Sequence, residues 1–189
     1  MFNIIRPLIF KFSPEVAHSL AIKALKLNNI SYSKPIDNHI LETTFCEKKL
    51  SSPIGVAAGF DKNAEVYNPL FNLGFGFVEV GTITPKPQFG NPKPRVFRLE
   101  EDEALINRLG FNNSGSEQIS QTIKENNKKG FLGINIGPNK DSKDRIEDYL
   151  ICFRKFYNLA DYITINISSP NTENLRDFHN QDELNLLID

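Results

Sequence analysis

Residues 162–172 read YITINISSPNT, an apolar, β-branched run followed at once by a polar, serine-rich turn. A run of this kind predicts a buried strand, and the turn marks its end. Three other runs share this character and end in the loops AAGFDKN, GTITPKPQ and NIGPNK. The four predicted strands are residues 54–58, 77–81, 132–136 and 162–167, and the predicted helices are residues 64–73, 116–127, 146–159 and 182–188.

The alternation of short apolar runs with helical stretches predicts βα units and a parallel sheet, hence an α/β fold. In such folds ligands bind at the carboxyl ends of the strands, where the loops converge. Four polar strand ends therefore point to a site. Residues 95–107, RVFRLEEDEALIN, have the character of a hairpin inserted between the second and third strands.

The first 40 residues form a separate predicted element. Pro7 limits any helix in residues 1–12, whereas Ser13 and Pro14 are typical of an N-cap and a first helical position. Two interpretations remain open: a helical extension that packs on the core, or a membrane-surface anchor. The anchor is suggested by apolar residues beside Arg6 and Lys11, namely Phe2, Ile4, Ile5, Leu8, Ile9 and Phe10. Residues 28–39 form a linker, and residues 41–189 form the second predicted domain.

Composition excludes several classes of protein. A formal net charge of -1 over 189 residues argues against nucleic acid as a partner. Cys46 and Cys152 have neither CxxC spacing nor histidine neighbours, which indicates reduced thiols rather than a disulfide or a metal site. His18, His39 and His179 lack metal-ligand spacing, so no metal is expected. No apolar run approaches the roughly 20 residues of a membrane span.

Four asparagines, Asn107, Asn135, Asn166 and Asn171, lie in or beside the strand-end loops. A carboxamide offers donors and an acceptor without charge, so a ring of carboxamides suits a planar ligand such as a pyrimidine. Each asparagine alone fits equally well as a loop cap. Lys62 follows small residues that let a flat cofactor approach the backbone, and it could neutralise a carboxylate or remain a solvated surface lysine.

Ser169 is the candidate catalytic group. A serine hydroxyl is a poor base unless a relay or a nearby positive charge assists it, and turn capping by Ser168 and Ser169 is the plain alternative.

The motifs AAGFDKN, GTITPKPQFGNPKPRVFRLEEDEALINRLGFNNSG, GINIGPNK and INISSPNTENLR together resemble the quinone-dependent, class 2 dihydroorotate dehydrogenases, in the same order. The resemblance implies a (β/α)₈ TIM barrel with FMN as cofactor, which oxidises dihydroorotate to orotate in pyrimidine biosynthesis and passes electrons to a membrane quinone. It also implies peripheral membrane contact on the cytoplasmic face of a bacterial inner membrane. One departure is Asn174, where the family usually has glycine.

The resemblance also implies residue roles. Ser169 is the base that removes the C5 proton while hydride leaves C6. Flavin contacts are implied for Ala58, Gly59, Phe60, Asp61, Lys62, Thr82, Asn135 and Asn166. Substrate contacts are implied for Lys62, Asn107, Arg108, Leu109, Gly110, Phe111, Asn166 and Asn171. His18 and Arg98 match positions of the quinone pocket.

A (β/α)₈ barrel needs about 250 residues, so the sequence predicts roughly its first half, preceded by a helical hairpin. The isolated chain is then expected to bind FMN weakly or not at all and to lack turnover. Two alternatives remain: a non-catalytic half-barrel that associates with itself or with a complementary chain, and another flavin barrel such as a tRNA dihydrouridine synthase. The second would need a basic face and a cysteine acid.

Overall fold

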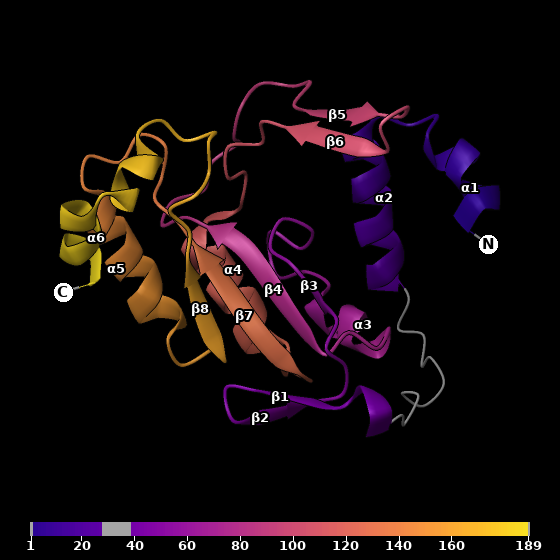
Figure 1. The fold of residues 1–189 in the computed structure, drawn as a ribbon, viewed down its shortest axis with the longest axis horizontal. Helices are drawn as coiled ribbons and strands as arrows, with labels where there is room; N and C mark the ends of the chain where they lie inside the picture. Colours follow the sequence, from indigo (N-terminus) through magenta and orange to yellow (C-terminus); the bar gives the residue numbers. More distant parts are fainter. Residues whose placement is uncertain (1, 28–38, 189) are drawn as a thin grey trace.

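The predicted parallel sheet is present in the computed structural model, which describes residues 2–27 and 39–188. Four strands lie in the order β3–β4–β7–β8 and all neighbours are parallel (Figure 1). Their bounds are Gly55–Val56, Phe77–Ile83, Phe131–Ile136 and Tyr162–Ile165. The order along the sheet follows the order along the chain, as in a barrel wall. The predicted first strand is confirmed in position but is reduced to two residues.

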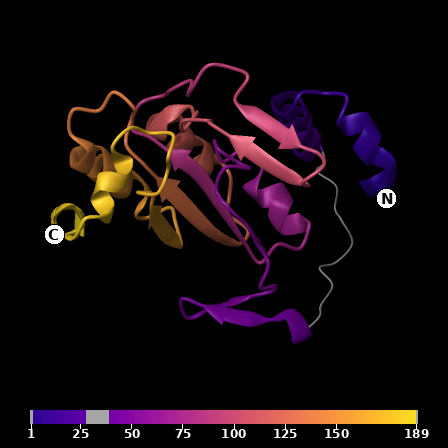
Figure 2. The ribbon, with the colours of Figure 1, turned by 45° about the horizontal axis from the view of Figure 1, so that its top comes forward.

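The helices follow the strands as the sequence predicts, and α4 and α5 lie on one side of the sheet (Figures 1 and 2). Their bounds are Tyr67–Asn72 for α3, Gly115–Glu125 for α4, Arg145–Phe156 for α5 and Gln181–Ile188 for α6. A 3₁₀ turn, η2, covers Leu175–His179 ahead of α6. Helix α3 begins three residues later than predicted.

The alternation of side chains along each strand separates a helix-facing side of the sheet from a polar side. Val78 and Val80 of β4 are fully buried in the apolar core with the α4 and α5 residues Ile119 and Phe156. Glu79 stands between the two valines and points to the opposite side. The apolar face thus stabilises the fold, and the polar face is available for a site.

Two antiparallel hairpins lie at opposite ends of the sheet (Figure 1). The upper hairpin, β5 (Val96–Leu99) with β6 (Ala104–Asn107), confirms the hairpin predicted within residues 95–107. The lower one, β1 (Thr43–Phe45) with β2 (Lys48–Leu50), follows a 3₁₀ turn, η1 (His39–Leu41), and was not predicted. Its Phe45 ring meets the rings of Phe131 and Tyr162, the first residues of β7 and β8. The lower hairpin therefore covers the amino ends of the strands.

The N-terminal element consists of α1 (Phe2–Ile9) and α2 (Pro14–Leu27). The start of α2 at Pro14 confirms the predicted boundary. Pro7 does not end α1, which continues two residues beyond it. Pro7 has no N–H to donate within the helix, but the turn that contains it is still closed, because the Phe10 N–H donates to the Arg6 carbonyl oxygen at 2.9 Å. The predicted linker falls largely on residues outside the described ranges.

Helix α2 is fixed to the rest of the fold by an ion pair. Arg95 is 6% exposed, and its Nη2 donates to Glu15 Oε1 at 2.8 Å. Arg95 Nη1 also donates to the carbonyl oxygens of Phe89 and Asn91 in the loop before β5. Ile22 of α2 belongs to the core. Helix α2 therefore packs on the core. This holds regardless of what the outer faces of α1 and α2 contact.

Asp161 joins the lower hairpin to the sheet. Its carboxylate accepts from Lys48 Nζ, from Lys128 Nζ at 2.6 Å and from the Leu132 amide at 2.8 Å. Burial by itself raises the pKa of Asp161, but the hydrogen bonds from Lys128, Lys48 and Leu132 outweigh it and lower that pKa below 3.8. A carboxyl with a lowered folded-state pKa stabilises the fold above the unfolded pKa and loses this effect as the pH falls.

We expect Asp161→Asn to lower the free energy of unfolding at neutral pH by about 1–3 kcal/mol, because a buried amide loses its charged acceptor. The variant should also lose less stability than the parent as the pH falls below about 4. Urea unfolding at several pH values measures both effects. The control is Glu147→Gln, whose exposed pair with Arg154 should contribute less than about 0.5 kcal/mol. Equal losses in both variants would contradict the prediction.

Candidate active site

A cavity of about 380 Å³ opens at the carboxyl ends of the strands, below the loop that follows β6. Its volume falls within the range of small-molecule sites. The predicted residues that line it are Ala58, Gly59, Lys62, Thr82, Asn107, Leu109, Gly110, Phe111, Asn135, Asn166, Ser169 and Asn171. The structure therefore brings most of the predicted flavin and substrate residues to one place.

The four asparagines converge, and two of them are held by a defined network. Asn135 Oδ1 accepts from Thr82 Oγ1 at 2.6 Å and from Asn166 Nδ2 at 3.2 Å. Asn166 Nδ2 also donates to Thr82 Oγ1 at 3.0 Å. The backbone oxygen of Asn166 accepts from Tyr149, which fixes the loop to α5. These carboxamides are oriented by the protein rather than free to rotate.

Lys62 is half-buried, and its Nζ donates to the Gly59 carbonyl oxygen. Burial lowers the pKa of Lys62, and the nearby Glu15 carboxylate opposes that shift. A ligand carboxylate or other anion beside Nζ would favour the charged form of the lysine. Lys62 is therefore suited to bind an anionic group that enters the cavity.

The surroundings of Ser169 agree with both interpretations that the sequence left open, turn capping and a place in the site. Its Oγ accepts from the Asn171 backbone N–H at 3.2 Å, a turn-capping hydrogen bond, and it also lines the cavity. A backbone donor at the oxygen stabilises negative charge that develops there when the hydroxyl takes part in proton transfer. Asn174 has φ of +54°, a left-handed conformation that asparagine tolerates better than most residues, so it can stand where the resemblance implies glycine.

Three predicted contact residues lie outside the cavity. Phe60 packs against the core, and its carbonyl oxygen accepts from His18 Nε2 at 2.7 Å. Asp61 is 1% exposed and accepts from the amides of Glu65 and Val66 ahead of α3. Burial raises the pKa of Asp61, and these amides partly offset the rise. Arg108 is exposed and donates to the Pro94 carbonyl oxygen. The described contacts of these three residues are with the protein itself, and the ligand contacts implied for them stay predictions.

The cavity is also lined by Ala57, one of the small residues ahead of Lys62, and by three residues that the sequence did not single out: Glu79, Gly81 and Asn112. Glu79 had a usable signal, since it is a lone charged residue within the apolar strand FVEVG. Asn112 continues the NRLGF motif by one residue. Its Oδ1 is buried and has no hydrogen-bond partner among the described residues.

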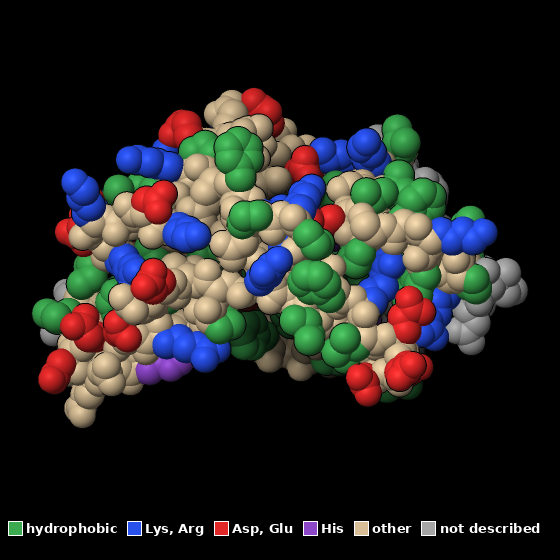
Figure 3. All heavy atoms as spheres, turned by 90° about the horizontal axis from the view of Figure 1, so that it is seen from above, with side chains coloured by type: hydrophobic (Ala, Val, Ile, Leu, Met, Phe, Trp, Pro, Cys, Tyr) green, Lys and Arg blue, Asp and Glu red, His purple; other side chains and the backbone are tan. Residues whose placement is uncertain are grey.

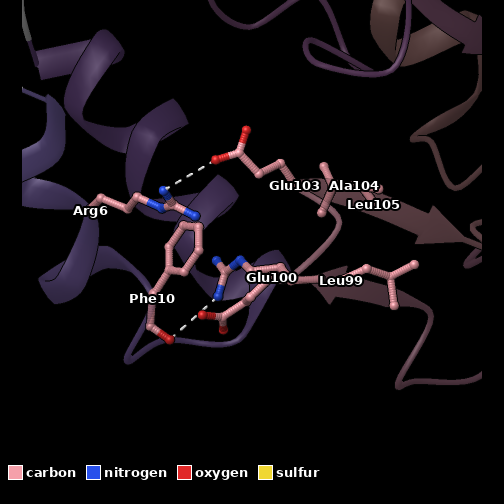
Figure 4. A pocket seen from close by; sticks show the side chains of 8 residues that line it. Arg6, Phe10, Leu99, Glu100, Glu103, Ala104 and Leu105 are labelled. Atoms are coloured by element: carbon pink, nitrogen blue, oxygen red, sulfur yellow. Dashed lines mark hydrogen bonds and ion pairs between the residues drawn. The ribbon is translucent and has the colours of Figure 1, made fainter.

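A second cavity, of about 350 Å³, lies between α1 and the β5–β6 hairpin (Figure 4). The Arg98 guanidinium lies 4.5 Å from the centre of the Phe10 ring, and its Nη1 donates to the Phe12 carbonyl oxygen at 2.8 Å. Arg6 lies over the same ring and 4.0 Å from Glu103 (Figure 4). His18, the other predicted quinone residue, does not line this cavity and contacts Phe60 instead.

The fold and the first cavity define a class of protein. A parallel sheet whose strands follow chain order, with helices on one side and a polar cavity at the carboxyl ends, is the wall of a (β/α)₈ barrel of the kind that carries enzyme sites.

Comparison with known proteins identifies the family within this class. The family model described as "Dihydroorotate dehydrogenase" matches residues 40–188. A protein of Bartonella henselae named dihydroorotate dehydrogenase (quinone) is 53% identical over 97% of this chain and 50% of its own length. One of Nitrosomonas europaea with the same name is 46% identical over 100% of this chain and 56% of its own length. The chain belongs to the dihydroorotate dehydrogenase family.

A solved structure agrees with the assignment. The crystal structure of DHODH from Eimeria tenella in complex with ferulenol superimposes with a TM-score of 0.86 and 41% identity. The superposition covers 93% of this chain and 49% of the Eimeria tenella chain. The chain thus spans about half the length of the curated relatives and of the solved structure that it matches. The part of the (β/α)₈ barrel that it provides carries the first cavity.

Proposed function

We propose that this chain provides the first half of an FMN-dependent, quinone-linked dihydroorotate dehydrogenase of pyrimidine biosynthesis. The observation that carries the proposal is the convergence of Lys62, Ser169 and the four strand-end asparagines on one cavity, in a chain of this family. Their donor set fits FMN and dihydroorotate, because oriented carboxamides match planar heterocycles and Lys62 matches an anionic group.

The residues have separate roles in this proposal. Asn135, Asn166, Thr82 and the backbone at Gly59 hold the flavin. Lys62 binds the substrate carboxylate, while Asn107 and Asn171 orient the dihydropyrimidine ring together with residues 109–111. The other residues that line the cavity exclude water.

In the proposed reaction dihydroorotate loses a proton from C5 and a hydride from C6, which leaves the C5–C6 double bond of orotate. Ser169 Oγ takes the C5 proton as its own hydroxyl proton passes to solvent water, and the Asn171 N–H stabilises the negative charge that develops on the oxygen. The chemistry that FMN supplies when bound is acceptance of the hydride and delivery of two electrons to the quinone. Arg98 and the cavity beside α1 are proposed to form part of the quinone pocket.

The test compares the isolated chain with a completed protein, in which this chain is joined to the part of the Bartonella henselae relative that the match does not cover. The completed protein should show flavin absorbance and form orotate from dihydroorotate and a short-chain quinone. The isolated chain should bind FMN weakly or not at all and show no turnover, because the sheet lines only one side of the site. A completed protein without flavin would contradict the proposed function.

A second candidate is a non-catalytic half-barrel that associates with itself or with a complementary chain. The observation in its favour is the exposure of apolar side chains at both edges of the sheet, with Ile54 64% and Ile165 42% exposed. Sedimentation of the isolated chain tests it. Ordered oligomers without flavin, together with a completed protein that never binds FMN, would favour this candidate over the dehydrogenase.

We also propose that α1 contacts the cytoplasmic face of a bacterial inner membrane. Ile5, Leu8 and Phe12 are 42%, 59% and 43% exposed beside Arg6 and Lys11, and this combination favours an anionic lipid surface. Figure 3 shows apolar and basic side chains intermingled on the face seen from above, with acidic ones between them. No helix within residues 2–27 and 39–188 is long and apolar enough to cross a bilayer.

Vesicle binding tests this contact. Leu8→Glu should weaken binding to anionic vesicles by about tenfold, because it removes apolar area and adds a repelled charge. The matched control is Leu186→Glu on α6, which is 61% exposed and lies at the opposite end of the molecule from α1 (Figure 1). Equal binding by both variants would contradict the membrane role of α1.

A further inference from the structure

Glu79 is a carboxylate on the polar face of the sheet whose place the function proposed above does not explain. It lies on β4, lines the first cavity and is half-buried. Its Oε1 accepts from Asn135 Nδ2 at 2.8 Å, and its Oε2 accepts from Tyr162 Oη at 2.9 Å and from Thr164 Oγ1 at 3.0 Å. One side chain of β4 thus binds partners on both β7 and β8.

The chemistry of these contacts allows one orientation of the Asn135 carboxamide. An ionised carboxylate only accepts hydrogen bonds, so the amide nitrogen of Asn135 must face Glu79. On the other side, Asn135 Oδ1 accepts from Thr82 and Asn166. A flipped amide would set its oxygen against the carboxylate and its nitrogen against the donor nitrogen of Asn166. Both contacts would be repulsive.

The orientation leaves one donor for a ligand. Asn135 Nδ2 carries two hydrogens, and Glu79 takes one of them. The other has no partner among the described residues, while the two hydrogens of Asn166 Nδ2 are directed at Thr82 and Asn135. Asn135 is only 6% exposed, so the cavity is where a partner for the second hydrogen can enter.

We propose that Glu79 is a positioning residue of the flavin site, which fixes the Asn135 carboxamide so that its second N–H faces an acceptor edge of the isoalloxazine ring. The inference rests on the proposed function, since it names a second layer of the same site. Glu79 acts through Asn135. The competing explanation is a purely structural one, in which the carboxylate only ties β4, β7 and β8 together.

Substitutions at Glu79 distinguish these explanations. In Glu79→Gln the new Oε1 can accept from Asn135 while the new N–H donates to the hydroxyls of Tyr162 and Thr164, so the orientation is kept. Glu79→Met has similar length and no strong acceptor. Glu79→Asp keeps the charge and withdraws the acceptor from Asn135 by one methylene. Asp161→Asn is the matched control, because Asp161 also accepts three hydrogen bonds but lies at the amino ends of the strands.

The measurement is the dissociation constant of FMN, from quenching of flavin fluorescence, in the completed protein, with urea unfolding alongside. Glu79→Met and Glu79→Asp should weaken FMN binding by about tenfold or more, and Glu79→Gln by less than about threefold. Asp161→Asn should lower stability without changing FMN binding. If the Glu79→Met variant does not fold, the FMN affinity of the Glu79→Asp variant tests the proposal instead. Folded Met or Asp variants with parental FMN affinity, or a Gln variant as weak as Asp, would overturn the proposal.

A second readout needs no flavin and separates this proposal from the proposed function. In the isolated chain, one side-chain N–H of Asn135 should exchange slowly with solvent in ¹H–¹⁵N spectra, assigned with Asn135→Asp. That protection should persist in Glu79→Gln and disappear in Glu79→Met. If the completed protein binds no FMN, the proposed function fails, while this result still decides whether Glu79 orients Asn135. Equal exchange in the parent and the Met variant would overturn the inference.

Discussion

Ser169→Ala should lower turnover of the completed protein by about 10²- to 10⁴-fold, the usual contribution of a positioned general base. The hydroxyl lines the cavity and its oxygen accepts from the Asn171 amide, so removing it takes away both the proton acceptor and the group that this amide stabilises. Of the proposed flavin contacts only Asn166 shares the loop after β8, and its carboxamide is held by Thr82 and Asn135 rather than by Ser169, so FMN affinity should stay close to that of the parent. Steady-state rates with dihydroorotate and a short-chain quinone measure the loss.

Two variants show whether the effect belongs to the base. Ser168→Ala removes the neighbouring hydroxyl, which donates to Asn166 Oδ1 at 3.2 Å, and should cause a much smaller loss. Ser169→Cys should recover part of the activity, most strongly as the pH rises towards the ordinary thiol pKa of about 8.5. Equal losses at positions 168 and 169, with unchanged FMN binding, would mean that the turn and not the base is what the reaction needs.

The sequence predicted the sheet well because burial imposes a simple pattern on it. Each helix-facing residue of β4 and β7 must be apolar, and the polar loops that follow mark where the strands end. The β1–β2 hairpin escaped prediction because its turn residues, Cys46 and Glu47, have φ of +47° and +60° without a glycine or asparagine to signal the turn. Its position depends on ring contacts with Phe131 and Tyr162, which are remote in sequence.

The sequence predicted those parts of the site that lie at the ends of the strands. Asn135, Asn166 and Asn171 meet because parallel strands bring their carboxyl ends together, whereas Asn107 reaches the same cavity from the end of β6 in the antiparallel hairpin. Asp61 shows the limit of this reasoning. It lies beside Gly59 and Lys62 in sequence, yet its side chain turns away to accept the free amides ahead of α3. Adjacency in a motif does not state which way a side chain points, and buried amides compete for a carboxylate.

The other large effect is expected at Gly59, where the proposed flavin lies close to the backbone. Gly59 has φ of +106°, and a Cβ added there would meet no atom within 4 Å. Since Gly59 lines the cavity, that Cβ would project into the space where the proposed flavin lies. We expect Gly59→Ala to weaken FMN binding of the completed protein by about 10- to 100-fold, from a steric contact worth about 1.4–2.8 kcal/mol.

Gly74→Ala is the control that separates backbone strain from steric exclusion of the flavin. Gly74 has φ of +96°, and its added Cβ would also meet nothing within 4 Å, but it is exposed at the end of α3 and does not line the cavity. Both alanines should therefore lower the free energy of unfolding by a similar amount, about 1–2 kcal/mol. Only Gly59→Ala should weaken FMN binding, measured by flavin fluorescence. Equal FMN affinities in the two variants would show that the flavin does not pass over Gly59, and would move the proposed cofactor site away from this loop.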